Sequence, residues 1–234
     1  MVKRRIITMA VVLVMTAQSA LAASFTDIKG HWAESTITAI ADKGVVNGVT
    51  NTQFIPDGEV TRAQYLKMIM EATGLKTVPV RRGECLDASN GQWYGPYLQS
   101  ALDSGLIPEP MVAGYKEEVK YELDENGNAT SSKVIYQGAF NGELPITREE
   151  MAVLTQYVYQ YTRTILTTTP VKENKKQTFT DTDKISDWAK TSVVQAVANG
   201  FMDGMDNNLF NPGYTATRAQ AATVILRVIN KIGE

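Results

Sequence analysis

The sequence predicts a mostly α-helical protein assembled from three copies of one helix–loop–helix unit. Three spacings that recur along the chain support this prediction. A Thr-Arg pair followed by any residue and then Gln or Glu occurs three times, a Phe lies eight residues before each Arg, and a Trp lies twelve residues before a Gly. The residues at these positions are Arg62, Arg148 and Arg218; Phe54, Phe140 and Phe210; Trp32, Trp93 and Trp188; and Gly44, Gly105 and Gly200. Three copies of one unit imply three copies of one site.

The first helix of each unit is predicted from apolar residues that recur after the Trp. In the first copy, Trp32, Ile37 and Ile40 are assigned to one helical stripe. Gly44 follows at the point where a residue in the left-handed conformation would end the helix. The other copies repeat this pattern, so we expect the three Trp side chains to be buried, with one ring edge lining a groove.

The second helix of each unit begins at the Thr-Arg pair. Thr61 can act as the N-cap, and Gln64 completes a capping box in which each side chain satisfies the other's backbone amide. Leu66, Ile69 and Met70 then follow at helical spacing. A lone helix pair buries too little apolar surface to be stable, so we expect the three units to pack around a common axis.

The second unit carries an insertion. From the Gly to the Arg there are 18 residues in the first and third copies and 43 in the second. The additional residues lie at about 109–138, where Val119, Tyr121 and Leu123 alternate with polar residues in the manner of a strand. A polar Asn-Gly turn and a second apolar run follow, which predicts a β-hairpin.

Residues 1–22 have the pattern of a secretory signal peptide, with a basic start, a short apolar stretch and a small-residue cleavage sequence. The apolar stretch is too short to cross a bilayer, which disfavours the alternative of a retained membrane anchor. We expect no membrane span after the signal peptide is removed. The expected boundaries are 1–22 for the signal peptide, 23–76 for the first unit, 85–166 for the second and 178–234 for the third.

Composition excludes several classes of function. Without the signal peptide, 20 basic residues face 25 acidic ones, a formal charge of −5, so the chain has no bulk attraction for nucleic acid. Cys85 is the only cysteine, which excludes an intramolecular disulfide, and we interpret it as a small apolar core residue. His31 is the only histidine, and we interpret it as a helix-start residue rather than a catalyst. No metal site and no cofactor are predicted.

These motifs together resemble the S-layer homology family. The run Phe-Thr-Asp-Ile-Lys-Gly-His-Trp-Ala-Glu from residue 25, the helix-ending Gly, the Phe-x-Pro turn and Thr-Arg-Ala-Gln follow the family's pattern in order. The resemblance covers three tandem modules and implies a pseudo-threefold assembly around a central helical bundle. It further implies a secreted protein of the bacterial cell surface, held noncovalently in the cell wall or S-layer. The implied ligand is a secondary wall polysaccharide that carries ketal-linked pyruvate, or another peptidoglycan-associated polymer.

The three Arg residues suit a carboxylate ligand. Arg62, Arg148 and Arg218 each occupy the first position of a predicted helix, where unpaired backbone amides and the helix dipole favour an anion. The planar guanidinium can donate two parallel hydrogen bonds to the carboxylate of a pyruvate ketal. We therefore predict that all three are exposed and contact the ligand. The alternative is a structural clip between each Arg and the Asp of its own or a neighbouring unit.

Three further sets complete the predicted polysaccharide site. The Asp that opens each unit could orient the Arg and accept sugar hydroxyls, with a turn or cap role as the alternative. The Trp residues could stack on a sugar ring, and the Gly residues could allow the backbone to approach the ligand closely. The sets are Asp27, Asp87 and Asp181; Trp32, Trp93 and Trp188; and Gly44, Gly105 and Gly200.

The sequence thus predicts a noncatalytic protein that binds cell-wall polysaccharide. A second hypothesis is a surface interaction protein whose hairpin, at residues 109–138, recruits a protein partner. A third is a wall hydrolase that uses Glu149 and Glu150 as paired carboxylates, although acidic residues are common in the first turn of a helix.

Overall fold

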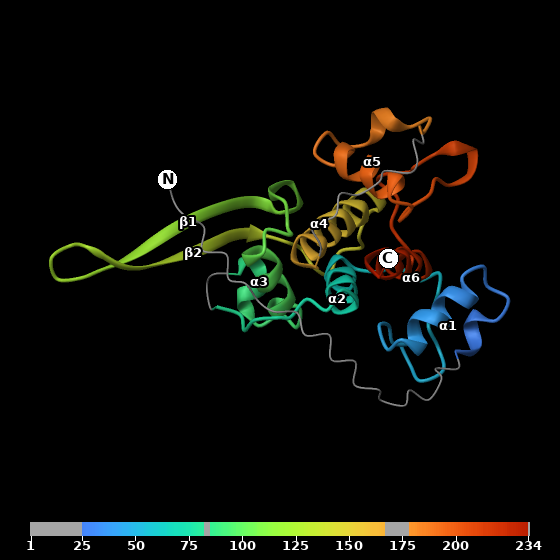
Figure 1. The fold of residues 1–234 in the computed structure, drawn as a ribbon, viewed down its shortest axis with the longest axis horizontal. Helices are drawn as coiled ribbons and strands as arrows, with labels where there is room; N and C mark the ends of the chain where they lie inside the picture. The colour runs from blue at the N-terminus through green and yellow to red at the C-terminus, as the bar shows by residue number, and fades with distance from the viewer. Residues whose placement is uncertain (1–24, 82–84, 167–177, 234) are drawn as a thin grey trace.

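The computed structural model describes residues 25–81, 85–166 and 178–233 (Figure 1). The predicted signal peptide and the segment 167–177 lie outside these residues. The described part is mostly helical, as predicted. Its helices are α1 (Glu34–Asp42), α2 (Arg62–Ala72), α3 (Gly95–Asp103), α4 (Arg148–Leu166), α5 (Lys190–Ala198) and α6 (Arg218–Ile232). Its strands are β1 (Ala113–Leu123) and β2 (Ala129–Ala139), and short 3-10 turns lie at Thr26–Ile28, Leu86–Asn90, Glu109–Met111, Thr182–Lys184 and Asp206–Asn208.

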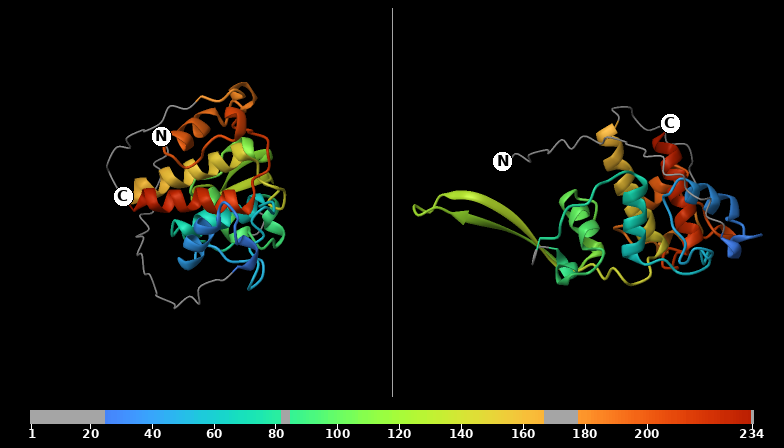
Figure 2. Two further views of the ribbon diagram at one scale, coloured as in Figure 1. Left: turned by 90° about the vertical axis from the view of Figure 1, so that its right-hand side faces the viewer. Right: turned by 90° about the horizontal axis from the view of Figure 1, so that it is seen from below.

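Three helices form the centre of the molecule. We refer to residues 25–76, 85–166 and 178–233 as the first, second and third repeats. The second helices of the repeats, α2, α4 and α6, pack against one another, while α1, α3 and α5 lie outside them (Figures 1 and 2). Helix α3 packs on α2, α5 on α4, and α1 on α6. The first helix of each repeat therefore packs on the second helix of the preceding repeat, and the first repeat packs on the third.

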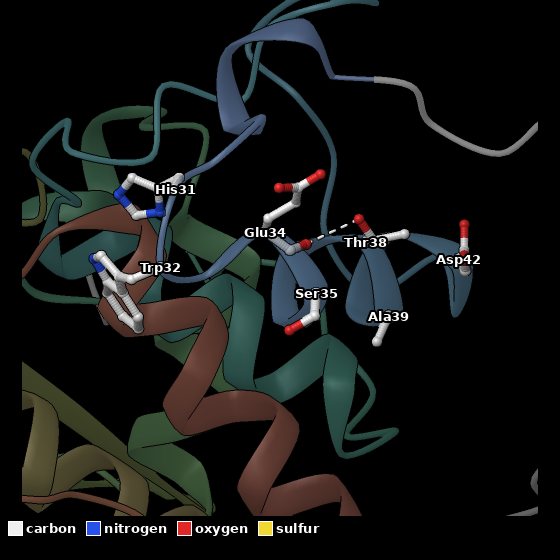
Figure 3. A pocket seen from close by; sticks show the side chains of 7 residues that line it. All are labelled: His31, Trp32, Glu34, Ser35, Thr38, Ala39 and Asp42. Atoms are coloured by element: carbon white, nitrogen blue, oxygen red, sulfur yellow. Dashed lines mark hydrogen bonds between the residues drawn. The ribbon is translucent and has the colours of Figure 1, made fainter.

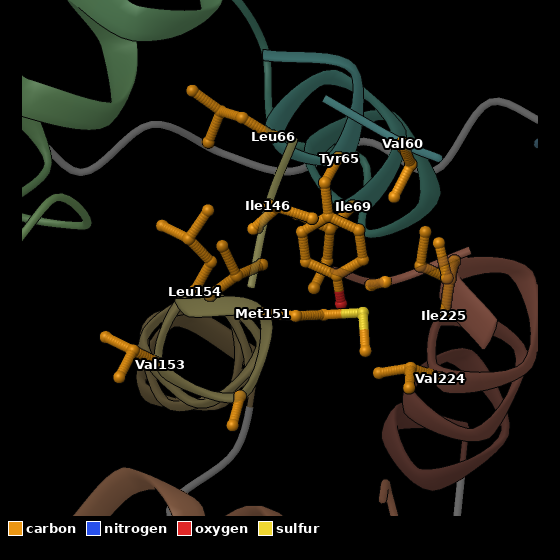
Figure 4. Close-up of a cluster of buried hydrophobic side chains, with 14 of the residues drawn as sticks. Val60, Tyr65, Leu66, Ile69, Ile146, Met151, Val153, Leu154, Val224 and Ile225 are labelled. Carbon is orange, nitrogen blue, oxygen red and sulfur yellow. The ribbon is translucent and has the colours of Figure 1, made fainter. Parts of the chain in front are cut away.

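The core between the central helices is apolar and fully enclosed (Figure 4). The Tyr65 hydroxyl lies 2.6 Å from Thr155 Oγ1, which in turn donates to the carbonyl of Met151, so these two buried hydroxyls are satisfied. Each fully buried Leu or Ile contributes about 1.5–3 kcal/mol. The side chains that meet there include Leu66 and Ile69 from α2, Met151 and Leu154 from α4, and Val224 and Ile225 from α6.

The N-termini of the central helices have the predicted capping boxes. The hydroxyls of Thr61 and Thr217 accept from the amides three residues later, and the Gln side chains return to the Thr amides. In α4, Glu150 N donates to Thr147 Oγ1 and Thr147 N donates to Glu150 Oε2. The boxes are therefore confirmed in all three repeats.

The residues just before these helices join the repeats through a closed triangle of backbone hydrogen bonds. Val60 N donates to Ala216 O at 3.1 Å, Ala216 N to Ile146 O at 2.9 Å, and Ile146 N to Val60 O at 3.0 Å. All three side chains are buried. The triangle fixes the starts of α2, α4 and α6 relative to one another, in a place where water cannot compete for the amides.

The hairpin predicted in the second repeat is confirmed. Strands β1 and β2 pair antiparallel and project away from the helices (Figures 1 and 2). The base is anchored because Tyr136 on β2 forms a parallel bridge with Cys85, and Ile135 is buried. Among the described residues, no helix is both long enough and apolar enough to span a bilayer.

Cys85 is a buried core residue, as interpreted from the sequence. Its Sγ lies 3.7 Å from the carbonyl of Gly95. Burial raises the pKa of the thiol to about 12, and the nearby carboxylates of Asp103 and Asp87 act in the same direction. The nucleophilic thiolate is therefore scarce at physiological pH.

We expect Cys85 in the folded protein to react with iodoacetamide about a thousandfold more slowly than an unperturbed thiol at mildly alkaline pH, because so little of it is ionised. In urea the same residue should react at the rate of an unperturbed thiol. Mass spectrometry of alkylated protein measures both rates. Complete alkylation of the native protein within minutes would contradict the buried position.

Candidate functional site

The Asp that opens each repeat holds the loop of its own repeat in place. The carboxylate of Asp27 accepts from Phe54 N at 2.9 Å and from Ile55 N at 2.7 Å. Asp87 and Asp181 accept in the same way from the Phe of their loops and from the residue after it. The residues after the Phe are Ile55, Asn141 and Asn211, with φ of 56°, 55° and 54°. The three Asp residues thus have the turn role that the sequence left as an alternative.

The contacts of Asp181 and Asp27 stabilise the ionised forms of these two carboxylates. Burial raises the pKa of Asp181, but hydrogen bonds from the Phe210 and Asn211 amides outweigh it, so the pKa lies below the ordinary value. Asp27 follows the same pattern: burial raises its pKa, but the hydrogen bonds from the Phe54 and Ile55 amides outweigh this effect, so its pKa also lies below the ordinary value.

The three Arg residues join each repeat to the next one. Arg148 Nε donates to Phe210 O at 2.7 Å, and its Nη2 donates to Asp203 O at 2.9 Å. Arg218 donates likewise to the carbonyls of Phe54 and Asn47 in the first repeat. Each guanidinium also lies over a Phe ring of the repeat that it contacts. The guanidinium-to-centroid distances are 4.8 Å for Arg62 on Phe140, 5.0 Å for Arg148 on Phe210 and 4.5 Å for Arg218 on Phe54.

Arg62 makes a different set of contacts. Its Nη1 pairs with Glu150 and its Nη2 donates to the carbonyl of Met111, next to the hairpin. Its Nε is buried without a hydrogen-bond partner among the described residues. The contact between the first and second repeats therefore keeps the ring stacking on Phe140 and replaces the hydrogen bond to the Phe carbonyl with an ion pair.

The predicted exposure of all three Arg residues is wrong. Arg62 and Arg148 are buried, and Arg218 is only partly exposed. Burial lowers the pKa of Arg148 to about 10, although Asp181 and Asp203 act in the opposite direction. Nor do the helix starts offer free amides, because the first two amides of each central helix donate to the loop of the next repeat. The expected anion pocket at each helix start is therefore already filled by protein carbonyls.

The Trp residues are also placed differently from the prediction. Trp32 is 63% exposed and Trp93 is 47% exposed, whereas Trp188 is partly buried. The first helices begin two residues after each Trp, so the Trp lies in the preceding turn. In each repeat the residue after the Trp points into the core instead; these residues are Ala33, Tyr94 and Ala189, and all three are buried. The predicted burial is thus wrong for two of the three rings, and these two present aromatic surface to solvent.

The helix-ending role predicted for the Gly residues is confirmed. Gly44, Gly105 and Gly200 have φ of 69°, 68° and 76°, a conformation that residues with a Cβ rarely adopt. Open space surrounds the place where a Cβ would stand at each of them. The backbone conformation, rather than crowding, therefore explains Gly at these positions.

A groove runs along the outer face of α1 with Trp32 at one end (Figure 3). Its volume is about 610 Å³. His31 is held beside the Trp, because its Nδ1 accepts from Ala33 N at 3.1 Å and its Nε2 lies 3.1 Å from Asp57 Oδ1. His31 is thus a helix-start residue, as interpreted from the sequence. The groove is lined by His31, Trp32, Glu34, Ser35, Thr38, Ala39 and Asp42.

The other two repeats also fix the residues around the Trp. Trp93 Nε1 donates to Glu143 Oε1 at 2.7 Å, which orients the exposed ring. In the third repeat, Ser186 donates from both its amide and its hydroxyl to Glu149 of the second repeat. Among the described residues, no cluster of His, Cys, Asp and Glu is arranged to hold a metal ion. An exposed, oriented indole beside hydroxyl and carboxylate groups can stack on a sugar ring and hydrogen-bond to its hydroxyls.

A family model described as "S-layer homology domain" matches residues 24–66 and 178–222. The chain carries S-layer homology domains at these two regions. It is 32% identical to the amylopullulanase of Thermoanaerobacterium thermosulfurigenes over 211 residues, which are 90% of the chain and 10% of that protein. It is 31% identical to the exoglucanase XynX of Acetivibrio thermocellus over 208 residues, 89% of the chain and 16% of that protein. It is 25% identical to the S-layer protein sap of Bacillus anthracis over 224 residues, 94% of the chain and 23% of that protein.

S-layer homology domains attach proteins to the cell wall, so this chain is a secreted, wall-binding protein of the cell surface. The chain spans between a tenth and a quarter of the length of these three relatives. Proteins named amylopullulanase and exoglucanase and a protein named S-layer protein align with the same region. The alignments therefore carry no catalytic activity over to this chain.

We expect Arg148→Ala to lower the free energy of unfolding by on the order of 3 kcal/mol, because it leaves the Phe210 and Asp203 carbonyls without their charged donor. Arg227→Ala is the matched control, since Arg227 also contacts Asp203 but is more than a third exposed, and it should cost less than about 1 kcal/mol. Urea denaturation followed by circular dichroism measures both. An equal decrease in the free energy of unfolding for the two variants would show that the buried contacts of Arg148 stabilise the fold no more than the exposed contact of Arg227.

Stability should also fall in acid. The folded pKa of Asp181 is depressed, so its contribution is present above the unfolded pKa of about 3.9 and is lost as the pH falls through the folded pKa. Asp181→Asn should be less stable than the wild type at neutral pH and should lose less stability below about pH 4. Asp183→Asn, at an exposed neighbouring carboxylate, should keep the steeper wild-type dependence. Unfolding curves from neutral to acidic pH provide the comparison, and identical acid slopes for wild type and Asp181→Asn would contradict this assignment.

Proposed function

We propose that this protein binds a cell-wall polysaccharide noncovalently through its exposed tryptophans and acts as a noncatalytic anchor. The observation that carries the proposal is the placement of Trp32 and Trp93 at equivalent positions in their repeats, exposed to solvent on the surface of a wall-binding protein. Exposed large aromatic rings are costly to hydrate, and carbohydrate sites commonly use them because the C–H face of a sugar ring packs on the indole.

The groove beside Trp32 has the chemistry that sugar hydroxyls need. Ser35 and Thr38 provide hydroxyl groups, and Glu34 and Asp42 provide acceptors along the same helix face. The residues that line the groove follow α1 from Trp32 to Asp42, a length that suits a segment of polymer more than a single small molecule. Gly44 ends α1, and we propose that it allows polymer to pass close to the backbone there.

We further propose that the polymer carries ketal-linked pyruvate and that Arg218 binds the pyruvate carboxylate. Arg218 is the one residue of the Arg set that keeps partial exposure. Its Nε and Nη2 are held by carbonyls of the first repeat, and its Nη1 has no hydrogen-bond partner among the described residues. A guanidinium fixed in this way can donate from its remaining edge without losing side-chain entropy. Arg62 and Arg148 stay structural in this proposal.

We propose that residues 85–166 form a third, divergent S-layer homology domain and that the three repeats make a pseudo-threefold assembly. The cyclic order of the Arg–Phe contacts supports this, because the first repeat contacts the second, the second contacts the third, and the third contacts the first. The aspartate-held loop corner, the capping box and the helix-ending Gly of the second repeat support it as well.

The hydrolase hypothesis is disfavoured by the contacts of its two carboxylates. Glu149 accepts two hydrogen bonds from Ser186, and Glu150 pairs with the buried Arg62 while accepting from Thr147 N. Both groups are held in contacts between elements of the fold, so neither is placed to exchange protons with a substrate. This supports the noncatalytic role that we propose.

We expect Trp32→Ala and Trp93→Ala each to weaken binding to purified wall sacculi about fivefold to tenfold, because each change removes one stacking surface. Tyr121→Ala, on the exposed hairpin, is the control and should bind as the wild type does. Co-sedimentation with sacculi gives the affinities. Unchanged binding by both Trp variants would refute the proposed grooves.

Arg218→Lys should bind pyruvylated and pyruvate-free sacculi equally, whereas the wild type should prefer the pyruvylated form. Lysine keeps the charge and loses the planar fork, so the change tests geometry rather than net charge. Equal binding of the wild type to both kinds of sacculi would overturn the pyruvate assignment and leave polysaccharide binding standing.

A further inference from the structure

The outer edge of strand β1 is open. The sheet has two strands, and β2 is partly covered on its outer side by the bridge between Tyr136 and Cys85. Among the described residues, β1 has no strand beside it other than β2. Two-stranded ribbons are marginally stable alone, and an open edge presents backbone groups that can pair with another strand.

The register of the hairpin separates a mainly apolar face, on which Glu117 is the charged residue of β1, from a face on which charges alternate in sign. Val119 lies opposite Val134 and Tyr121 opposite Ser132, and these residues share one face because opposed residues point the same way. Val119 is 44% exposed and Tyr121 is 61% exposed. The other face of β1 carries charges of alternating sign, at Lys116, Glu118, Lys120 and Glu122.

We propose that β1 pairs antiparallel with β1 of a second copy of this chain, around a twofold axis at Val119. In this register Glu118 lies opposite Lys120 of the second copy, and Lys116 lies opposite Glu122 of the second copy. Symmetry produces each pair twice, so four opposite-charge pairs form on one face while the two Val119 side chains meet on the other. The product is a continuous four-stranded sheet.

Other registers are disfavoured by the same residues. A slip of two residues in one direction places Glu118 opposite Glu118 of the second copy. A slip of two residues in the other direction places Lys120 opposite Lys120 of the second copy. A slip of one residue brings the apolar face of one strand beside the charged face of the other. A slip of four residues keeps only two opposite-charge pairs, so the register about Val119 is favoured because it forms four. Protective edge strands, in contrast, usually carry charges that repel a second copy.

The existing hairpin leaves Lys120 in an unfavourable position that the proposed pairing relieves. Lys120 lies directly opposite Lys133 of β2, and like charges at opposed positions are destabilising. Its nearest acid on the same strand, Glu118, is 3.9 Å away with both side chains half exposed. A second copy would add a carboxylate on the open side of Lys120. Strand β2 carries no charge complementary to Lys133, so β2 offers no equivalent self-pairing.

The hairpin is also accessible. It projects beyond the helices in Figure 1 and in the right view of Figure 2, so a second ribbon can lie along β1 without meeting α3 or the central helices. The pairing leaves the groove at Trp32 uncovered, because that groove is on α1 in the first repeat. Dimerisation and polysaccharide binding are therefore separable.

The test is sedimentation of the chain from Ala23 over a range of concentrations, with three variants. The wild type should dimerise. Lys120→Glu should raise the dissociation constant about tenfold or more, because two attractive pairs become repulsive. Its own hairpin should gain stability, since the opposition to Lys133 becomes attractive, so loss of the dimer cannot be attributed to an unfolded hairpin. Glu118→Lys should also weaken the dimer.

The decisive measurement is the mixture of these two single variants, which should form a heterodimer because all the pairs become complementary again. The double variant E118K/K120E should dimerise without a second variant, because positions 118 and 120 again carry opposite charges, with the basic and acidic residues exchanged. A wild type that stays monomeric up to about millimolar concentration would overturn the proposal. So would a wild-type dimer that Lys120→Glu leaves unchanged, or a mixture that stays monomeric.

Discussion

One residue in each loop, the Phe of the repeat, connects the main contacts of the fold. In the third repeat, the amide of Phe210 is bound by Asp181, its carbonyl accepts from Arg148, and its ring lies under the same guanidinium. Phe54 has the same three contacts, with Asp27 and Arg218. The Asp belongs to the same repeat and the Arg to the preceding one. One residue thus couples the shape of a loop to the packing of two repeats, which explains why every repeat carries an Asp, a Phe and an Arg.

The second repeat shows what happens when that coupling is altered. Phe140 keeps its amide contact with Asp87 and its ring contact with Arg62, but the Arg turns to Glu150 and to the carbonyl of Met111. The segment that leads into the hairpin supplies that carbonyl. The insertion therefore changes the hydrogen-bond partners of the Arg62 guanidinium. The stacking of this guanidinium on Phe140, which joins the first and second repeats, is retained.

The sequence predicted local features well and contacts between repeats poorly. Capping boxes, left-handed Gly residues and the hairpin depend on neighbouring residues, and the structure confirms them. The Arg partners could not be read from the sequence, because Arg148 meets a carbonyl 62 residues away and any loop could have provided it. The Trp error was avoidable: Trp32 is five positions from Ile37, whereas the buried Ala33 is four positions away, which is the helical spacing. The exposed Trp residues of the proposed site follow from that correction.

The order of contacts has a consequence for how such a chain can change its length. An open array of repeats has two terminal faces, and further copies can be added at either one. Here Arg218 of the third repeat donates hydrogen bonds to the carbonyls of Phe54 and Asn47 in the first repeat. Val60, Ile146 and Ala216 each use both the amide and the carbonyl in the backbone triangle. A duplicated fourth copy would therefore find these contact groups already paired. Within this ring of contacts, additional residues are accommodated by extending a loop, as the hairpin of the second repeat does.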